Sequence, residues 1–152
     1  MKHFIIILFL FISCAKDESR DADNLYESKN FIGAIELYNE IINLKPNDIK
    51  SIYRRGRSYE ELKQFELAFK DYQKVLELDN ENSNATLSMA IHYIRNSNYI
   101  LAEKYSKKAI KINNGLHQAY FILGRSLQYQ GNFGDAVKAF DTSISLNSNY
   151  SD

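Results

Sequence analysis

The sequence predicts an all-α protein built from repeated pairs of helices. Its 152 residues include only one proline, and proline is the residue that most strongly interrupts helices. Small and aromatic residues recur every 34 positions over most of the chain, and apolar residues within each period follow steps of three and four. Such steps place side chains on one face of a helix. A period of this length accommodates two helices and the turn between them.

The composition argues against several other classes of protein. The chain is 45% hydrophobic and 25% charged, as in globular proteins and unlike disordered or collagen-like chains. Lys plus Arg and Asp plus Glu each number 19, so the formal net charge is zero. Because proteins that bind phosphate backbones usually carry a basic excess, no nucleic-acid partner is expected. The single cysteine cannot form an intramolecular disulfide.

Residues 1–13 are interpreted as a signal peptide. Met1, Lys2 and His3 form a short basic start, and residues 4–12 are an unbroken apolar run of nine. A helix of nine residues spans about 14 Å, which is under half of a hydrocarbon core of about 30 Å. The run therefore suits an export signal and is too short for a stable membrane anchor.

The end of this segment, Phe11-Ile12-Ser13-Cys14, resembles the lipobox of bacterial lipoproteins. The resemblance implies cleavage after Ser13 and a thioether-linked diacylglycerol on Cys14, with acyl chains such as palmitate anchoring the protein. Residues 14–18 would form a lipidated tether. Ala15 after the cysteine favours the outer membrane over the inner in bacteria that have two. The alternative is an ordinary signal peptide followed by an incidental cysteine.

The rest of the chain is predicted to form four helix pairs. The first pair, residues 19–47, begins with a short polar helix, and the complete pairs cover 48–82, 83–116 and 117–150. Two-residue turns separate the helices of the complete pairs at 63–64, 97–98 and 131–132, and Asn, Asp and Ser residues between pairs supply helix caps. The columns of the period, from first pair to last, are Ala22, Gly56, Ala90, Gly124; Phe31, Phe65, Tyr99, Phe133; Ala34, Ala68, Ala102, Ala136; and Leu44, Leu78, Ile112, Leu146.

This pattern resembles the tetratricopeptide repeat. The last pair matches that family's signature as Tyr120-x2-Leu123-Gly124-x2-Leu127-x3-Gly131-x-Phe133-x2-Ala136-x3-Phe140. The resemblance implies a right-handed α-solenoid over residues 19–148. It also implies that Gly124 and Ala136 are small because two helices cross closely there, with Phe140 filling the remaining gap. Two residues depart from the pattern: Arg55 replaces a leucine, and Ser106 replaces an aromatic residue.

The resemblance further implies a concave groove lined by the first helix of each pair. Apolar pockets mixed with two guanidinium groups would suit an extended peptide that carries carboxylates or carbonyls. The alternative is a generic amphipathic surface. Family members that grip a C-terminal carboxylate use Lys and Asn at particular positions, which here hold Ser19, Asp23, Ile91, Gln118 and Ile122, so that clamp is not expected. The predicted groove residues are Tyr53, Arg57, Asn84, Leu87, Ile91, Gln118, Phe121 and Arg125.

The sequence predicts no enzyme, no cofactor and no metal site. His92 and His117 fall on separate helices without a neighbouring cysteine, which favours packing or surface roles over metal binding. The basic cluster Arg54-Arg55-Gly56-Arg57 is compatible with an RNA contact. We favour a packing role for the Arg55 stem, with Arg54 in water, because long basic side chains readily cover apolar surface.

We therefore expect an exported, lipid-anchored scaffold at the bacterial cell envelope that binds a protein or peptide, for example in envelope assembly. One alternative is a structural repeat protein that self-associates through its C-terminal end, where Phe140, Ile144 and Leu146 lie at positions that a following helix usually covers. The polar residues Thr142, Ser143 and Ser145 would serve as a partial substitute for a capping helix. Another alternative is a soluble adaptor that retains an uncleaved signal anchor.

Overall fold

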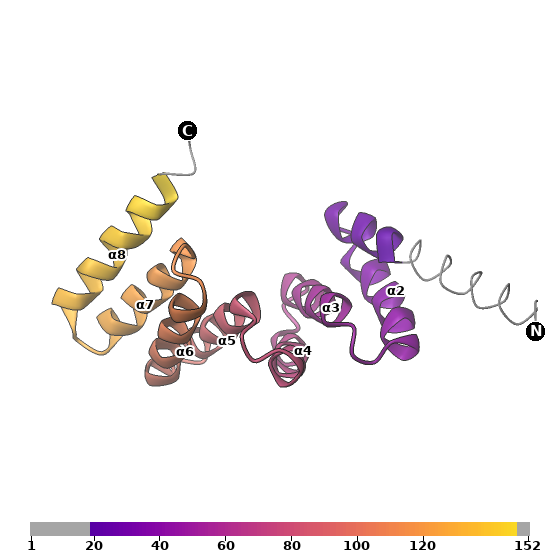
Figure 1. Ribbon diagram of the computed structural model, residues 1–152, viewed down its shortest axis with the longest axis horizontal. Helices are drawn as coiled ribbons and strands as arrows, with labels where there is room; N and C mark the ends of the chain where they lie inside the picture. The colour runs from indigo at the N-terminus through magenta and orange to yellow at the C-terminus, as the bar shows by residue number, and fades with distance from the viewer. Residues whose placement is uncertain (1–18, 149–152) are drawn as a thin grey trace, which may run out of the picture. The chain divides into compact units, whose positions relative to one another are not determined.

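The computed structural model describes residues 19–148, and every regular element among them is a helix (Figure 1). The prediction of an all-α fold is therefore confirmed. The proposed signal peptide, Cys14 and the tether lie outside the described residues. In the described part of the chain, no helix combines the length and the apolar composition that crossing a bilayer requires. A first helical segment covers 19–27, and the later helices are α2 (Phe31–Leu44), α3 (Ile49–Glu61), α4 (Phe65–Leu78), α5 (Ser83–Arg95), α6 (Tyr99–Ile112), α7 (His117–Tyr129) and α8 (Phe133–Ser148).

The chain divides into two compact units, Met1–Lys74 and Val75–Asp152, and the division falls within α4. One buried cluster of the first unit lies between its first helical segment and α2. It consists of Ala22, Ala34, Tyr38 and Ile41, each at most 2% exposed. The Tyr38 hydroxyl donates a hydrogen bond to Asp23 at 2.8 Å, so the polar end of this buried ring is satisfied.

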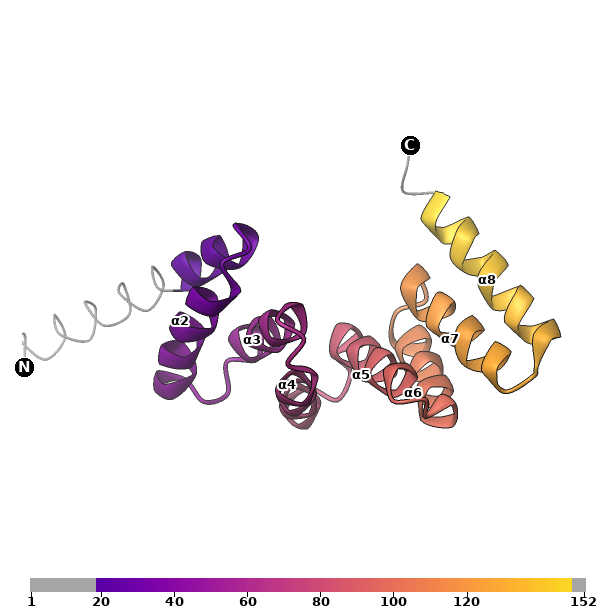
Figure 2. The ribbon, with the colours of Figure 1, turned by 180° about the vertical axis from the view of Figure 1, so that it is seen from behind.

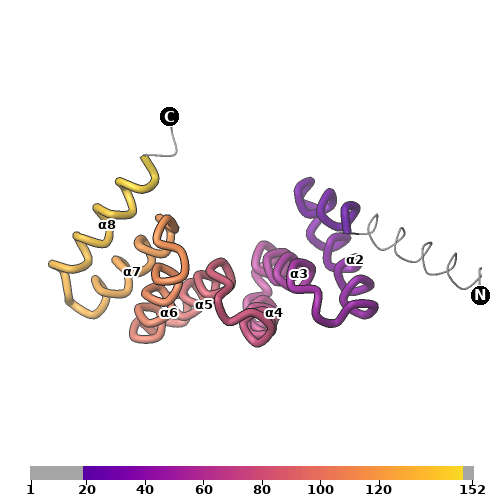
Figure 3. The backbone as a smooth tube through the Cα atoms, in the orientation of Figure 1, coloured from indigo at the N-terminus to yellow at the C-terminus, as the bar shows by residue number. Residues whose placement is uncertain are grey.

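The second unit contains two antiparallel helix pairs, α5 with α6 and α7 with α8, whose helices lie side by side in both ribbon views and in the tube (Figures 1, 2 and 3). Helix α7 also packs against α6 and α5, which joins the pairs. Many core positions are alanine, so the helix axes can approach closely. The buried cluster consists of Leu87, Ala90, Ile94, Ala102, Ala109, Ala119 and Ile122.

The turn within each pair has a left-handed residue at the same step of the period. Lys29, Lys63, Ser97 and Gly131 have φ values of 63°, 61°, 57° and 80°. Only the last is glycine, the residue that adopts this conformation at little cost. The preceding helix closes on this turn by backbone hydrogen bonds, as in Asn98 N–H to the Tyr93 carbonyl at 2.8 Å. These turns lie where the sequence predicts them.

The structure explains both departures from the repeat pattern. The Arg55 guanidinium donates to both carboxylate oxygens of Asp71, at 2.6 and 2.9 Å, and to Asn39 at 2.7 Å. This position is therefore occupied by a paired charge in place of an apolar side chain. Ser106 is fully buried and donates to the Ala102 carbonyl at 2.7 Å. The buried hydroxyl therefore has its hydrogen-bond partner within α6.

Candidate functional site

The eight predicted groove residues fall in both compact units. Tyr53 and Arg57 lie on α3 in the first unit, and the other six lie on α5 and α7 in the second. The two sets are therefore described separately.

In the first unit, Arg57 is held by carboxylates of its own helix. Its Nε lies 3.5 Å from Glu60, and its Nη2 lies 3.8 Å from Glu61. Burial disfavours the charged guanidinium, but the Glu60 carboxylate and the surrounding tyrosines together outweigh burial and raise the pKa of Arg57. The Tyr53 ring packs against Tyr72 with centroids 5.7 Å apart. An incoming carboxylate would have to compete with Glu60 and Glu61 for Arg57.

The sequence predicts Arg54 in water, but its guanidinium contacts the first helical segment. It donates to Glu27 at 2.8 Å, lies 3.9 Å from Asp23, and stacks over the Tyr26 ring at 4.9 Å from its centroid. Arg54 thus fastens α3 to the first helical segment. The basic cluster is used for packing between helices.

In the second unit, Ile91 and Arg125 meet in one cavity of about 380 Å³. Leu87 does not reach this cavity, because it is 6% exposed and belongs to the buried cluster. Asn84, Gln118 and Phe121 are exposed but do not line it. The lining side chains come from α5, the turn after it, the start of α6, and α7. They are Ile91, Ile94, Arg95, Ser97, Tyr99, Ile122, Arg125 and Tyr129.

One side of this cavity, which we call the α5–α7 pocket, is an aromatic wall. Tyr99 and Tyr129 stack with ring centroids 4.5 Å apart and planes inclined by 13°. The Arg125 guanidinium lies 5.8 Å from the Tyr129 ring centroid, within the range of a cation–π contact. That contact orients Arg125 while leaving its N–H groups available to an acceptor. The pocket therefore combines an aliphatic floor, an aromatic wall and guanidinium groups.

Six residues that line the α5–α7 pocket were not among the predicted groove residues: Ile94, Arg95, Ser97, Tyr99, Ile122 and Tyr129. Tyr99 was placed in a periodic column, but only as a packing residue. Arg95 and Tyr129 were not singled out, although both occupy the last position of a first helix, 34 residues apart. A search for columns that change from Glu to Arg or Tyr along the chain would have found them.

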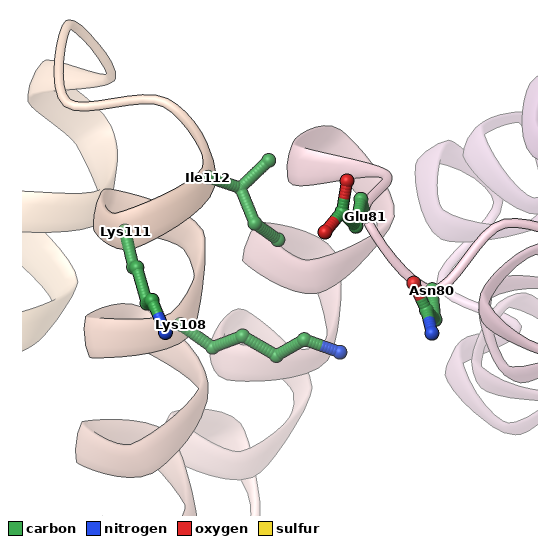
Figure 4. A pocket seen from close by; sticks show the side chains of 5 residues that line it. All are labelled: Asn80, Glu81, Lys108, Lys111 and Ile112. Carbon is green, nitrogen blue, oxygen red and sulfur yellow. The ribbon is translucent and has the colours of Figure 1, made fainter.

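A second surface that the sequence reading missed is a row of exposed lysines on α6. Their spacing places them on one side of the helix, and the residues are Lys104, Lys107, Lys108 and Lys111. Figure 4 shows Lys108 extended toward the side where Asn80 and Glu81 lie, across a depression of about 420 Å³. Lys107 pairs with Glu103 at 2.6 Å. The lysine side chains are long and exposed, so they define no fixed ligand geometry. We interpret this side of α6 as a solvated surface.

The described residues offer no arrangement for metal chemistry. Between residues 19 and 148, no group of three or more His, Cys, Asp or Glu side chains is placed to hold an ion. His92 lies with its Nε2 2.8 Å from the amide nitrogen of Asn96 on the same helix.

Antiparallel helix pairs that stack at a fixed step define a class of helical-repeat proteins, whose exposed faces bind other proteins. The family model described as "Tetratricopeptide repeat" matches residues 49–82 and residues 117–150. These two segments of the chain are therefore similar to tetratricopeptide repeats.

Curated proteins with similar sequences come from eukaryotes. Human "Tetratricopeptide repeat protein 7B" is 29% identical over 107 residues, covering 70% of this chain and 13% of that protein. Human "Peptidyl-prolyl cis-trans isomerase FKBP4" is 36% identical over 74 residues, covering 49% of this chain and 16% of that protein. The "DnaJ protein P58IPK homolog" of Arabidopsis thaliana is 32% identical, covering 51% and 16%. The chain thus spans under one fifth of each relative.

Solved structures share the fold. MamA from Desulfovibrio magneticus RS-1, residues 41 to the end, matches with a TM-score of 0.79 at 16% identity, covering 91% of this chain and 78% of that one. The first tetratricopeptide domain of Spaghetti (RPAP3), solved with the HSP90 peptide SRMEEVD, matches with a TM-score of 0.72 at 16% identity, covering 77% and 93%. The chain therefore shares the helical-repeat fold of these structures.

Proposed function

We propose that this chain is an exported, lipid-anchored tetratricopeptide scaffold that binds an extended segment of another protein in the α5–α7 pocket. The observation that carries the proposal is the meeting of Ile91 and Arg125 beside the Tyr99–Tyr129 stack. An apolar side chain of the ligand would lie on the aliphatic floor. A neighbouring carboxylate or main-chain carbonyl would accept hydrogen bonds from the Arg125 guanidinium.

The affinity of such a contact depends on its burial. A hydrogen bond to a charged group contributes about 1.5–3 kcal/mol when it is shielded from water and less when it is exposed. The side chain of Arg125 is neither fully buried nor fully exposed. The Spaghetti domain, which shares this fold, was solved with a bound acidic peptide, and this supports the choice of an extended peptide as ligand.

The membrane part of the proposal depends on the sequence alone. The lipobox-like residues around Cys14 support acylation and an envelope location, with the outer membrane favoured. Acyl chains contribute about 0.8 kcal/mol per buried methylene group, so two or three chains would hold the protein firmly at the bilayer.

Site-specific photo-crosslinking in living cells tests the binding site. A photoreactive amino acid at Ile91 should crosslink to a discrete protein partner, and the same probe at Lys70, an exposed site on α4, should not. Adding Arg125→Glu should weaken the Ile91 crosslink, because a guanidinium is replaced by a carboxylate. Equal crosslinking from both probe positions, or no loss with Arg125→Glu, would overturn the proposal.

A further inference from the structure

The outer face of α8 carries an exposed apolar stripe. Phe133, Val137 and Ile144 are 65%, 58% and 67% exposed, although all three are large apolar residues. Phe140 lies between them along the helix, and its ring packs against Phe121 of α7 with centroids 5.7 Å apart. We call these five residues the α8 patch.

The repeat itself shows what such a face normally contacts. One period earlier, Phe121 corresponds to Leu87, which is 6% exposed because it belongs to the cluster shared with α7. Ile144 corresponds to Ile110, which packs against the same cluster. Phe133 corresponds to Tyr99, which stacks on Tyr129 of α7. The α8 patch is therefore the face on which the next helix stacks in the preceding pair, and no described helix covers it.

The polar residues of α8 do not shield this face. Ser143 is buried and donates a hydrogen bond to the His117 carbonyl at 2.7 Å, so it faces α7. Thr142 donates to the Lys138 carbonyl of its own helix at 2.9 Å. Ser143 is therefore turned toward α7 and away from the patch, and Phe133, Val137 and Ile144 stay exposed.

The chain's own first helix is unsuited to cover the patch of another copy. In α7, the residues that cover the preceding pair include Ile122 and Tyr129. The matching positions of the first helical segment, three periods earlier, are Arg20 and Glu27. Burying these charges against phenylalanine and isoleucine would be costly. A head-to-tail stack of copies is therefore disfavoured.

We propose that two copies of the chain associate through the α8 patch, with their α8 helices antiparallel about a two-fold axis. The apolar positions 133, 137, 140 and 144 have steps of four, three and four, so their spacing is unchanged when the helix direction is reversed. An antiparallel pair therefore places Phe133 against Ile144 and Val137 against Phe140. Such an isologous contact is self-complementary and closes after two copies.

Charge and size agree with this pairing. Lys138 and Asp135 pair with each other at 2.9 Å on another side of α8, so they need not enter the contact. Since an aromatic side chain offers about 150–250 Å² of surface, the exposed part of the patch amounts to roughly 400 Å² per copy. Two copies then bury roughly 800 Å² plus the flanking residues, which is below the size of stable interfaces and in the range of weak, transient contacts. The association is therefore reversible and depends on concentration.

Sedimentation equilibrium of the full chain in a non-ionic detergent tests the proposal. The wild-type chain should approach a dimer as its concentration rises. Val137→Glu and Ile144→Glu should each raise the dissociation constant at least about tenfold while leaving the helical circular dichroism unchanged, because both side chains are exposed. Ile100→Glu, at a 72% exposed site on α6, is the matched control and should dimerise like the wild type.

Cysteine crosslinking tests the orientation. A mixture of Phe133→Cys and Ile144→Cys chains should form mixed disulfide dimers beyond the background of the wild-type chain, whose only cysteine is Cys14. A wild-type chain that stays monomeric would overturn the proposal. So would dimers that survive both glutamate variants, or patch residues that capture only a different protein.

Discussion

Gly124 lies directly against the ring of Phe140. A Cβ atom at Gly124 would come within 2.6 Å of Phe140 Cε1, closer than carbon atoms can approach. Two periods earlier, the same relationship links Gly56 to Tyr72, where a Cβ would lie 2.9 Å from the ring. A glycine on the first helix thus permits an aromatic ring on the second, and together they set the close crossing of the pair.

We predict that Gly124→Ala destabilises the second unit by about 1–3 kcal/mol, because the added methyl group overpacks the crossing. This outweighs the gain in helix propensity of up to about 1 kcal/mol. Gly134→Ala is the control: its Cβ would meet nothing within 4 Å, so the propensity gain should appear alone. Urea unfolding measures both, and Phe140→Leu should partly rescue Gly124→Ala. A stabilising Gly124→Ala would contradict the tight crossing.

The second prediction concerns the Arg55–Asp71 pair. Asp71 is 6% exposed, so Asp71→Ala leaves a guanidinium without its partner and should cost about 3 kcal/mol of unfolding free energy. Replacing both residues with leucine restores the apolar pattern of the repeat and should cost much less, because no unpaired charge remains. Thermal and urea unfolding of the two variants provide the comparison. A double variant as unstable as Asp71→Ala would show that the pair is not exchangeable.

The third prediction concerns acid stability. Burial raises the pKa of Asp23, but hydrogen bonds from Lys50 and Tyr38 and the charge of Arg54 outweigh it, and the pKa lies below its ordinary value of 3.8. A depressed pKa stabilises the fold above the unfolded value, and this stabilisation is lost as the pH falls through the folded pKa. Wild type should therefore lose stability more steeply than Asp23→Asn between about pH 5 and pH 2.

Denaturant unfolding at several pH values checks this difference. Glu40→Gln, an exposed site on α2, is the control and should follow the wild-type curve. At neutral pH, Asp23→Asn should be less stable than wild type by about 1 kcal/mol, because its partly exposed charge pairs are lost. Parallel pH curves for wild type and Asp23→Asn would contradict the assigned role.

The fourth prediction concerns membrane attachment. If Cys14 is acylated, the wild-type protein should stay in the membrane fraction during high-salt and carbonate extraction, because buried acyl chains and not surface charges hold it. Cys14→Ala should accumulate as an unprocessed precursor or be released by these washes. Fractionation with mass measurement of the N-terminus distinguishes the forms. Equal retention and equal mass of both proteins would exclude lipid attachment at this residue.

The fold was predictable from the sequence because it repeats. The 34-residue columns depend on local packing between two helices, as at Gly124 and Phe140. Such packing restricts the residue types at these positions, and the restriction is visible in the sequence. The left-handed turns were predictable in position for the same reason. The partners of charged residues were not, because Asn39 and Asp71 contact Arg55 from helices elsewhere in the chain.

The candidate site was only partly predictable. The groove-facing column included Ile91 and Arg125, which share the α5–α7 pocket, and their role in binding stays a prediction. The same column included Leu87, which is buried by α7. Its equivalent Phe121 is 48% exposed, because no described helix covers it. Both residues occupy the same face of their helices. They differ in exposure because α7 covers Leu87, whereas no described helix covers Phe121.

The binding claim is tested most directly by the affinity of the wild-type chain and of Arg125→Glu for a peptide from the crosslinked partner. Fluorescence anisotropy of the labelled peptide should show at least about a tenfold loss of affinity for Arg125→Glu, which corresponds to about 1.4 kcal/mol. Lys138→Glu, an equal charge change at an 80% exposed site on α8, should bind nearly as well as wild type. Equal affinities for all three proteins, or an equal loss in both variants, would contradict peptide binding in the α5–α7 pocket.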